Sequence, residues 1–151
     1  MHMPAYSHSQ SMKSLWLIIA ASALLISVTV ARLPDGSPVW PLAPILMVHV
    51  ALLLVFGSFT IELNAHMIDW RFGMLGKPRW RMPLGDIASV ELTRTSWLEG
   101  WGIRYTREGM LYNAHGLGAI RLRLRNGRSL RLGSDEPERL KAFLEARLPP
   151  H

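Results

Sequence analysis

Two long apolar runs near the N-terminus constrain this chain more than any other feature. The first, Leu15–Ala31, carries no charge, and at ~1.5 Å of helical rise per residue it covers most of a hydrocarbon core ~30 Å thick. The second, Trp40–Ile61, follows the short polar stretch RLPDGSPV, which is rich in turn-forming residues. Residues 13–61 therefore predict a membrane hairpin of two helices, over residues 14–33 and 40–61.

A secretory signal peptide is the alternative interpretation of the first run. Lys13 provides the positive flank that such peptides need, and small residues lie near the end of the run. The second run weighs against this interpretation, because cleavage after the first run would still leave one membrane span. We therefore expect a multi-pass membrane protein.

The basic residues beside the two runs indicate the orientation. Lys13 precedes the first run, and the connecting loop holds only Arg32, which Asp35 offsets. A further basic group follows the second run. Since short cytoplasmic segments are enriched in Lys and Arg, both termini are expected in the cytoplasm, with the hairpin in the inner (plasma) membrane. The residues of that further group are Arg71, Lys77, Arg79 and Arg81.

His49 is a strongly polar residue deep in the second apolar run. A polar group in hydrocarbon needs a partner, which makes it a functional candidate by default. The same imidazole can instead hydrogen-bond to Ser22 or Ser27 of the first run and only hold the hairpin together, a contact worth ~0.6 kcal/mol on average. Proton relays use several such groups, so a single histidine favours the structural role.

Charged residues gather beyond Ile61, where they account for most of the net charge of +6. Residues 62–148 are enough for one small hydrophobic core. The chain has no cysteine, so disulfides and thiolate metal sites are excluded. Residues 1–12 are expected to be a disordered tail. Their histidines and methionines form a soft, copper-like ligand set, but we predict neither a metal site nor a cofactor.

Beyond Glu62, apolar and polar residues alternate in the pattern of half-buried strands. The clearest case is AIRLRLRNGRSLRLG, in which leucine alternates with arginine. Asn126 and Gly127 predict a type I′ hairpin turn there, because both residues tolerate positive φ. Arg131, on the returning strand, is expected on the outer face with the other arginines. Further strands are predicted over residues 68–72, 80–84, 90–93, 103–105 and 110–113.

The period becomes helical after Gly133. Pro137 suits a first turn, and the apolar residues from Leu140 to Leu148 fall on one stripe. Several antiparallel strands followed by one amphipathic helix predict an α+β domain, in which a bent sheet or open barrel is capped by the helix.

These segments together resemble a bacterial pleckstrin-homology-like domain. The resemblance covers residues 62–148 and rests most on PLGDI, WGIRY and NGRSLRLGSDEPERL. Such domains often follow membrane hairpins. The motifs are structural, so the resemblance implies a fold and no catalytic residue.

Two basic sets are candidates for binding lipid or a partner. The first lies on the predicted connection between two strands and is similar to the first-loop signature of phosphoinositide-binding pleckstrin-homology domains, although the positive-inside bias also explains it. The second set could hold the domain flat against anionic lipid, at ~1 kcal/mol per basic residue. Alternatively, it could be a solvated sheet face on which nearby glutamates relieve the repulsion between the arginines. The sets are Lys77, Arg79 and Arg81, and Arg121, Arg123, Arg125, Arg128 and Arg131.

No catalytic pattern accompanies these features: the sequence contains no HExxH, no GxSxG and no phosphate-binding glycine loop. The predicted function is that of a non-enzymatic membrane protein whose cytoplasmic domain contacts anionic lipid or another membrane protein. Nucleic acid is not an expected partner, because no reading motif is present and the chain is tethered. The alternative is a small subunit of a transport or assembly complex in which the hairpin carries the activity.

Overall fold

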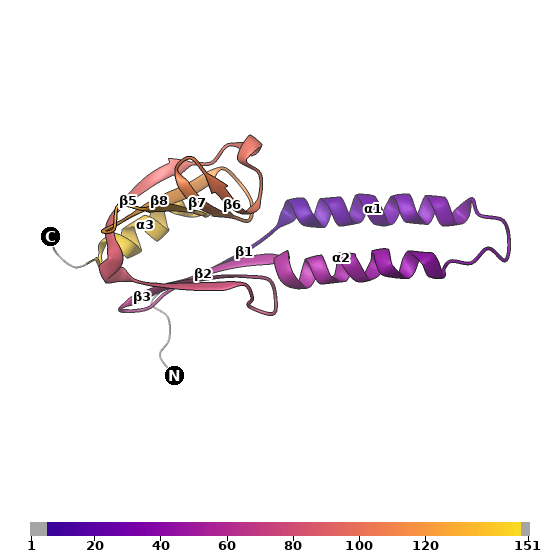
Figure 1. Ribbon diagram of the computed structural model, residues 1–151, viewed down its shortest axis with the longest axis horizontal. Helices are drawn as coiled ribbons and strands as arrows, with labels where there is room; N and C mark the ends of the chain where they lie inside the picture. The colour runs from indigo at the N-terminus through magenta and orange to yellow at the C-terminus, as the bar shows by residue number, and fades with distance from the viewer. Residues whose placement is uncertain (1–5, 149–151) are drawn as a thin grey trace.

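Two antiparallel helices project together from a head built of two β-sheets (Figure 1). The computed structural model describes residues 6–148. The first helix, α1, spans Lys13–Ala31, and the second, α2, spans Ala43–Phe56 after a 3₁₀ turn, η1, at Trp40–Leu42. The loop between them forms the end of the molecule farthest from the head (Figure 1).

The second helix is shorter than the predicted span of residues 40–61. It ends at Phe56, and a strand begins at Ser58, so the last apolar residues of the run belong to the head. Phe59 and Ile61 are buried there. Within residues 6–148, α1 is the one helix both long and apolar enough to cross a membrane, while the apolar segment Trp40–Phe56 is shorter.

The prediction of a disordered tail is wrong for residues 6–11, which form strand β1 (Tyr6–Ser11). This strand pairs antiparallel with β2 (Ser58–Leu63), the strand that follows α2. The helical hairpin is therefore inserted between two paired strands, and the head includes residues on both sides of it. Buried Gln10 helps to hold β1, since its side-chain amide donates to the carbonyl of Gly133 at 2.8 Å.

The strands form two sheets instead of the single bent sheet or open barrel expected. One has the order β1-β2-β3-β4 and the other β5-β8-β9-β7-β6. Short 3₁₀ turns, η2 (Leu84–Asp86) and η3 (Trp97–Glu99), flank β5. The remaining strands are β3 (Met67–Phe72), β4 (Arg79–Pro83), β5 (Ile87–Arg94), β6 (Gly102–Thr106), β7 (Gly109–Asn113), β8 (Gly118–Leu124) and β9 (Ser129–Gly133).

The second sheet is mixed, because β9 lies between β7 and β8 and runs parallel to β7. Glycine makes this close packing feasible. A Cβ at Gly133 would overlap the side chain of Asn113 at the end of β7. The sequence period predicts the strands themselves but not this order.

The hairpin between β8 and β9 is present, but its turn is not type I′. Gly127 has a φ of 81°, whereas Asn126 has a negative φ. The Gly127 N–H donates to the Leu124 carbonyl at 3.0 Å, and the Leu124 N–H donates to the Arg128 carbonyl at 2.8 Å. One positive-φ residue is thus enough for this longer turn.

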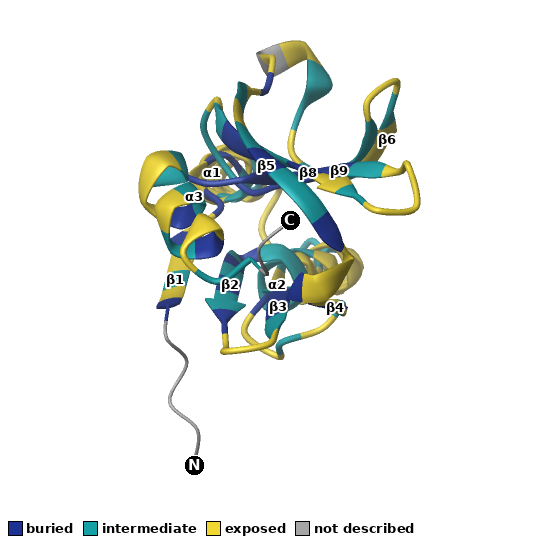
Figure 2. Ribbon diagram, turned by 90° about the vertical axis from the view of Figure 1, so that its left-hand side faces the viewer, coloured by how far each residue is buried: buried dark blue, intermediate teal, exposed yellow. Residues whose placement is uncertain are grey.

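The C-terminal helix α3 (Pro137–Glu145) covers the core beside β1, β5 and β8 (Figures 1 and 2). Leu140 and Leu144 are fully buried, which confirms the predicted stripe. Phe143 packs on Tyr6 of β1 with ring centroids 5.2 Å apart. The result is an α+β fold in which helices emerge from two sheets that a C-terminal helix caps.

Candidate functional site

The surface of the helical hairpin is apolar on all sides. Apart from Ser14, no residue of α1 or α2 is buried. Leu17, Leu25 and Met47 are 71%, 68% and 72% exposed. A helix that is hydrophobic all round is stable only where other apolar groups surround it. The rest of the described chain does not supply that cover.

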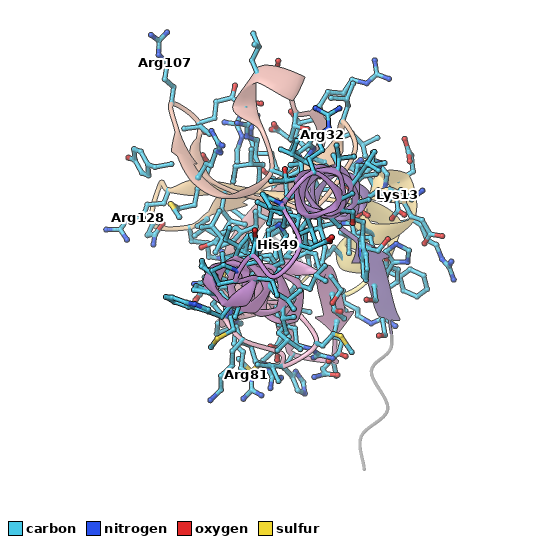
Figure 3. All side chains as sticks on the ribbon, turned by 90° about the vertical axis from the view of Figure 1, so that its right-hand side faces the viewer. Lys13, Arg32, His49, Arg81, Arg107 and Arg128 are labelled. Carbon is cyan, nitrogen blue, oxygen red and sulfur yellow. The ribbon has the colours of Figure 1, made fainter. Side chains whose placement is uncertain are left out.

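His49 lies between the two helices (Figure 3). Its Nε2 is 2.8 Å from the Ser22 hydroxyl oxygen, and its Nδ1 is 2.6 Å from the Ile45 carbonyl oxygen. A carbonyl can only accept, so Nδ1 carries the proton and Nε2 accepts from Ser22. The expected contact with Ser22 is confirmed. Ser27 instead donates to the Ala23 carbonyl at 2.9 Å.

Three of the predicted arginines, Arg121, Arg123 and Arg131, lie on the outer face of the second sheet and are named the outer arginines. Arg121 and Arg131 are directly opposite each other in the β8–β9 register. Like charges in such positions repel. Each of the three is within ion-pair distance of a glutamate, which offsets this repulsion. The glutamates are Glu91, Glu99 and Glu108.

Arg131 is buried, contrary to the expectation that it faces solvent, with a side chain only 3% exposed. Its guanidinium donates to Glu99 and, at 3.1 Å, to the hydroxyl of Thr106. Glu108 lies 3.4 Å away. Hydrogen bonds from Arg131 and from the backbone N–H of Ser96 lower the pKa of Glu99. The group is a structural network on the outer face of the second sheet, centred on the internal strand β9.

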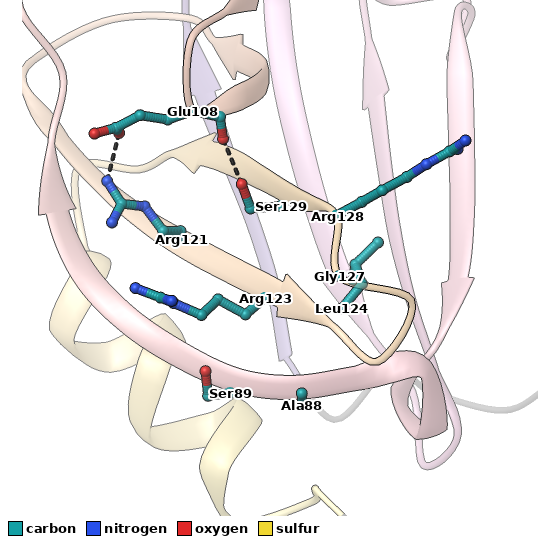
Figure 4. Close-up of a pocket in the computed structure, with 9 residues that line it drawn as sticks. All are labelled: Ala88, Ser89, Glu108, Arg121, Arg123, Leu124, Gly127, Arg128 and Ser129. Atoms are coloured by element: carbon teal, nitrogen blue, oxygen red, sulfur yellow. Dashed lines mark hydrogen bonds and ion pairs between the residues drawn. The ribbon is translucent and has the colours of Figure 1, made fainter.

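A pocket of about 390 Å³ lies between β5, β8 and the β8–β9 turn (Figure 4). Arg121 and Arg123 line it together with Ser129, and Glu108 accepts from Arg121. Arg128 also lines it but points away from the other two arginines in Figure 4. Glu108 and Glu91 offset Arg121 and Arg123, so the surplus positive charge of the pocket comes from Arg128.

Two arginines of the second predicted set have no carboxylate partner within residues 6–148. Arg125 donates through Nε to the Gly85 carbonyl at 2.8 Å. Arg128 is exposed and projects from the turn (Figure 3). The free positive charge of this set is thus at the turn and not along the strand.

The first predicted set lies on the other sheet and is also partly neutralised. Asp69, whose side chain is 6% exposed, pairs with Arg79 at 2.6 Å and with Arg81 at 2.9 Å. The hydrogen bonds that Arg79 donates to the Asp69 carboxylate raise the pKa of Arg79. Lys77 is exposed and forms no ion pair with the described residues. The two basic sets do not form one binding site.

An apolar groove lies where the hairpin joins the head. It has a volume of about 460 Å³, and its lining includes Met12, Leu15, Phe56 and Trp101. Trp101 is 43% exposed. The sequence places Trp101 in the WGIRY motif but does not predict this groove, because Met12 and Phe56 come from distant parts of the chain.

No group of three or more metal-binding side chains occurs among residues 6–148. His8 contacts Asp135 and lies 3.6 Å from Glu136, so it ties β1 to the segment before α3. His2, the other histidine of the expected tail, lies outside the described residues.

The chain matches no known family model, no curated protein and no solved structure. Its function therefore has to be argued from the hairpin and the head alone.

Proposed function

We propose that this chain is a non-enzymatic membrane protein whose helical hairpin crosses the bilayer and whose head contacts anionic lipid or a second membrane protein at the cytoplasmic surface. One observation carries the proposal. Most residues of α1 and α2 are apolar, and Ser14 is the one residue of these two helices that is buried. Lipid is the medium that covers such a surface without further protein.

The dimensions of the hairpin support two crossings. At a rise of ~1.5 Å per residue, α1 is ~28 Å long. The 3₁₀ turn η1 rises ~2 Å per residue, so η1 and α2 together extend ~27 Å. Both lengths approach the ~30 Å hydrocarbon core. Trp16 and Trp40, 52% and 75% exposed, lie near opposite ends of the hairpin, where interfacial aromatics are found.

The strand pairing supports the placement of both termini on one side. Since β1 and β2 are neighbours, α1 starts at the head and α2 returns to it. The head carries most of the basic residues, so the positive-inside bias favours the cytoplasm for it.

The contact role of the head rests on the inferred pleckstrin-homology-like fold. Two sheets closed by a C-terminal helix support that inference, while the parallel pair β7–β9 departs from the expected antiparallel sheet. Within the two predicted basic sets, exposed Lys77, Arg125 and Arg128 have no ion pair with the described residues, so they are free to meet an external anion.

The alternative function assigns the activity to the hairpin and a central role to His49. Both ring nitrogens are already engaged, by Ile45 and Ser22. This favours a structural histidine and hence the first proposal.

Topology is the decisive test of the anchor. The chain has no natural cysteine, so single cysteines can be introduced at Ser37 in the hairpin loop and at Ala65 in the head. In intact cells, a membrane-impermeant maleimide should label the Ser37→Cys variant and spare the Ala65→Cys variant. Recovery of the full chain in the supernatant of detergent-free lysates would contradict the proposal.

Co-purification in mild detergent tests the role of the head. A chain that ends after Ile61 keeps both helices but loses most of the head. It should lose any membrane protein that the full chain retains. Equal recovery of the partner by both chains would assign the contact to the hairpin instead.

A further inference from the structure

The loop between β3 and β4 packs directly against the head end of α2 (Figure 1). The Met74 N–H donates to the Leu54 carbonyl at 3.0 Å, and the Gly73 N–H donates to the Ser58 carbonyl at 2.7 Å. The first of these bonds satisfies a carbonyl in the last turn of α2, where helices lack internal donors. The loop therefore lies beside the last turn of a helix that we place in the bilayer.

Gly73 fixes this position. Its φ is +71°, and a Cβ on it would overlap the carbonyl oxygens of Leu54 and Val55. A side chain at this position would push the loop away from the helix. The close approach of the β3–β4 loop to α2 therefore requires glycine at position 73.

The loop presents large apolar side chains outward instead of into the core. Met74 is 79% exposed and Leu75 is 65% exposed. On α2, two residues before Leu54, Leu52 is also exposed, at 38%. Nothing among the described residues covers this tip.

Positive charge borders the apolar tip on its head side. Lys77 follows it in the same loop and forms no ion pair within residues 6–148. The nearby carboxylates are already engaged, Glu62 by Arg71 at 2.6 Å and Asp69 by Arg79 at 2.6 Å. An apolar tip followed by an unpaired cation complements a leaflet of anionic lipid, with acyl chains below the phosphates.

We propose that the β3–β4 loop is a third membrane-inserted element, which places Met74 and Leu75 at the headgroup–acyl boundary and Lys77 at the lipid phosphates. This inference rests on the proposed crossing of the membrane by the hairpin. The loop holds the first sheet against the leaflet, so the head has one orientation relative to the bilayer.

Site-directed fluorescence on the full chain tests the proposal. The absence of natural cysteine allows single variants, Met74→Cys and Leu75→Cys, labelled with an environment-sensitive dye. The matched control is Ala65→Cys, in the β2–β3 turn at the opposite end of the same sheet. Strand β2 separates the two ends by ~17 Å, since Ser58 and Leu63 are five steps of ~3.4 Å apart. A second control, Leu24→Cys, reports on the hairpin. The vesicles contain phosphatidylcholine and phosphatidylglycerol, with a quencher on lipids near the headgroups.

Dyes at residues 74 and 75 should emit at shorter wavelength than the dye at residue 65 and should be quenched by the lipid. Lys77→Glu should weaken that quenching in the Met74→Cys background, and unchanged quenching would remove the phosphate contact from the proposal. If the dye at residue 24 is shielded from water while those at 74 and 75 behave like that at 65, the loop proposal fails and the anchor stands. If the dye at residue 24 is also in water, both fail.

Discussion

Replacing buried Arg131 tests whether the outer arginines stabilise the head or bind lipid. The side chain is 3% exposed and pairs with Glu99, which is 28% exposed. In the Arg131→Met variant, Glu99 keeps its charge but loses its main partner. We expect a large loss of stability and little change in the affinity for anionic vesicles.

The magnitude follows from the contacts. Removing one member of a buried ion pair costs ~3–5 kcal/mol. Two features reduce the cost here: water reaches part of Glu99, and the loss of Arg131 relieves its repulsion of Arg121 across the strand pair, an effect of ~0.2–1 kcal/mol. A loss of ~3 kcal/mol remains, which lowers Tm by about 10–20 °C for a domain of this size.

Thermal unfolding of the full chain in lipid nanodiscs measures this loss. Arg128→Ala is the matched control, because Arg128 is an exposed arginine in the turn between β8 and β9. Its removal should change the stability by less than ~0.5 kcal/mol. In a double-mutant cycle with Glu99→Gln, the double variant should lose less than the sum of the two single variants. A Tm of Arg131→Met equal to that of Arg128→Ala would refute the reasoning.

The pair of Arg131 and Glu99 also predicts how the stability of the fold changes in acid. The folded pKa of Glu99 is below its ordinary value of 4.5, so in acid the unfolded chain binds more protons than the folded chain. The stability from this pair is therefore present above pH 4.5 and falls as the pH drops further. Glu99→Gln should flatten that fall in nanodisc unfolding measured from neutral pH downward.

Three other substitutions probe separate parts of the fold by unfolding of the full chain. Gly73→Ala should cost more than Gly116→Ala, because both glycines have positive φ but only Gly73 faces carbonyl oxygens, and equal losses would contradict the close packing of the loop. Burial raises the pKa of Tyr6 from 10.0 to about 12, so as the pH rises the unfolded chain loses the phenolic proton before the folded chain does. The free energy of unfolding should therefore fall by about 2–3 kcal/mol as the pH rises from 10.0 to about 12. Tyr6→Phe should remove this part of the fall, while Tyr112, whose pKa burial also raises, keeps its own contribution. His49→Leu should cost only ~0.6 kcal/mol and leave membrane insertion intact, whereas loss of insertion would refute a structural hydrogen bond.

Periodic segments could be predicted from the sequence because their burial is local. The alternation in residues 119–133 specifies which side chains of β8 and β9 enter the hydrophobic core, and the stripe from Leu140 to Leu148 specifies the inner face of α3. The apolar run Leu15–Ala31 gave the bounds of α1 to within a few residues. In each case, the residues that determine the type of element and its buried face are close together in the chain.

Strand β1 could not be recognised in this way. Its sequence YSHSQS has one large apolar residue, and the inward positions after Tyr6 are occupied by His8 and Gln10. Their partners, Asp135 and Gly133, are more than a hundred residues away in the chain. Arg131 was misplaced for a related reason, since the glutamates that permit its burial come from other segments.

The insertion of the hairpin between paired strands has a mechanical consequence. Only Met12 separates β1 from α1, and only Gly57 separates α2 from β2. Met12 is buried, and its N–H donates to the Gly57 carbonyl at 3.1 Å, so the two connections are bonded to each other. A head on a flexible linker samples many orientations, but here both strands continue directly into helices. A tilt of the hairpin must therefore move the first sheet, and a lipid or protein that binds the head acts on the helices through the same two strands.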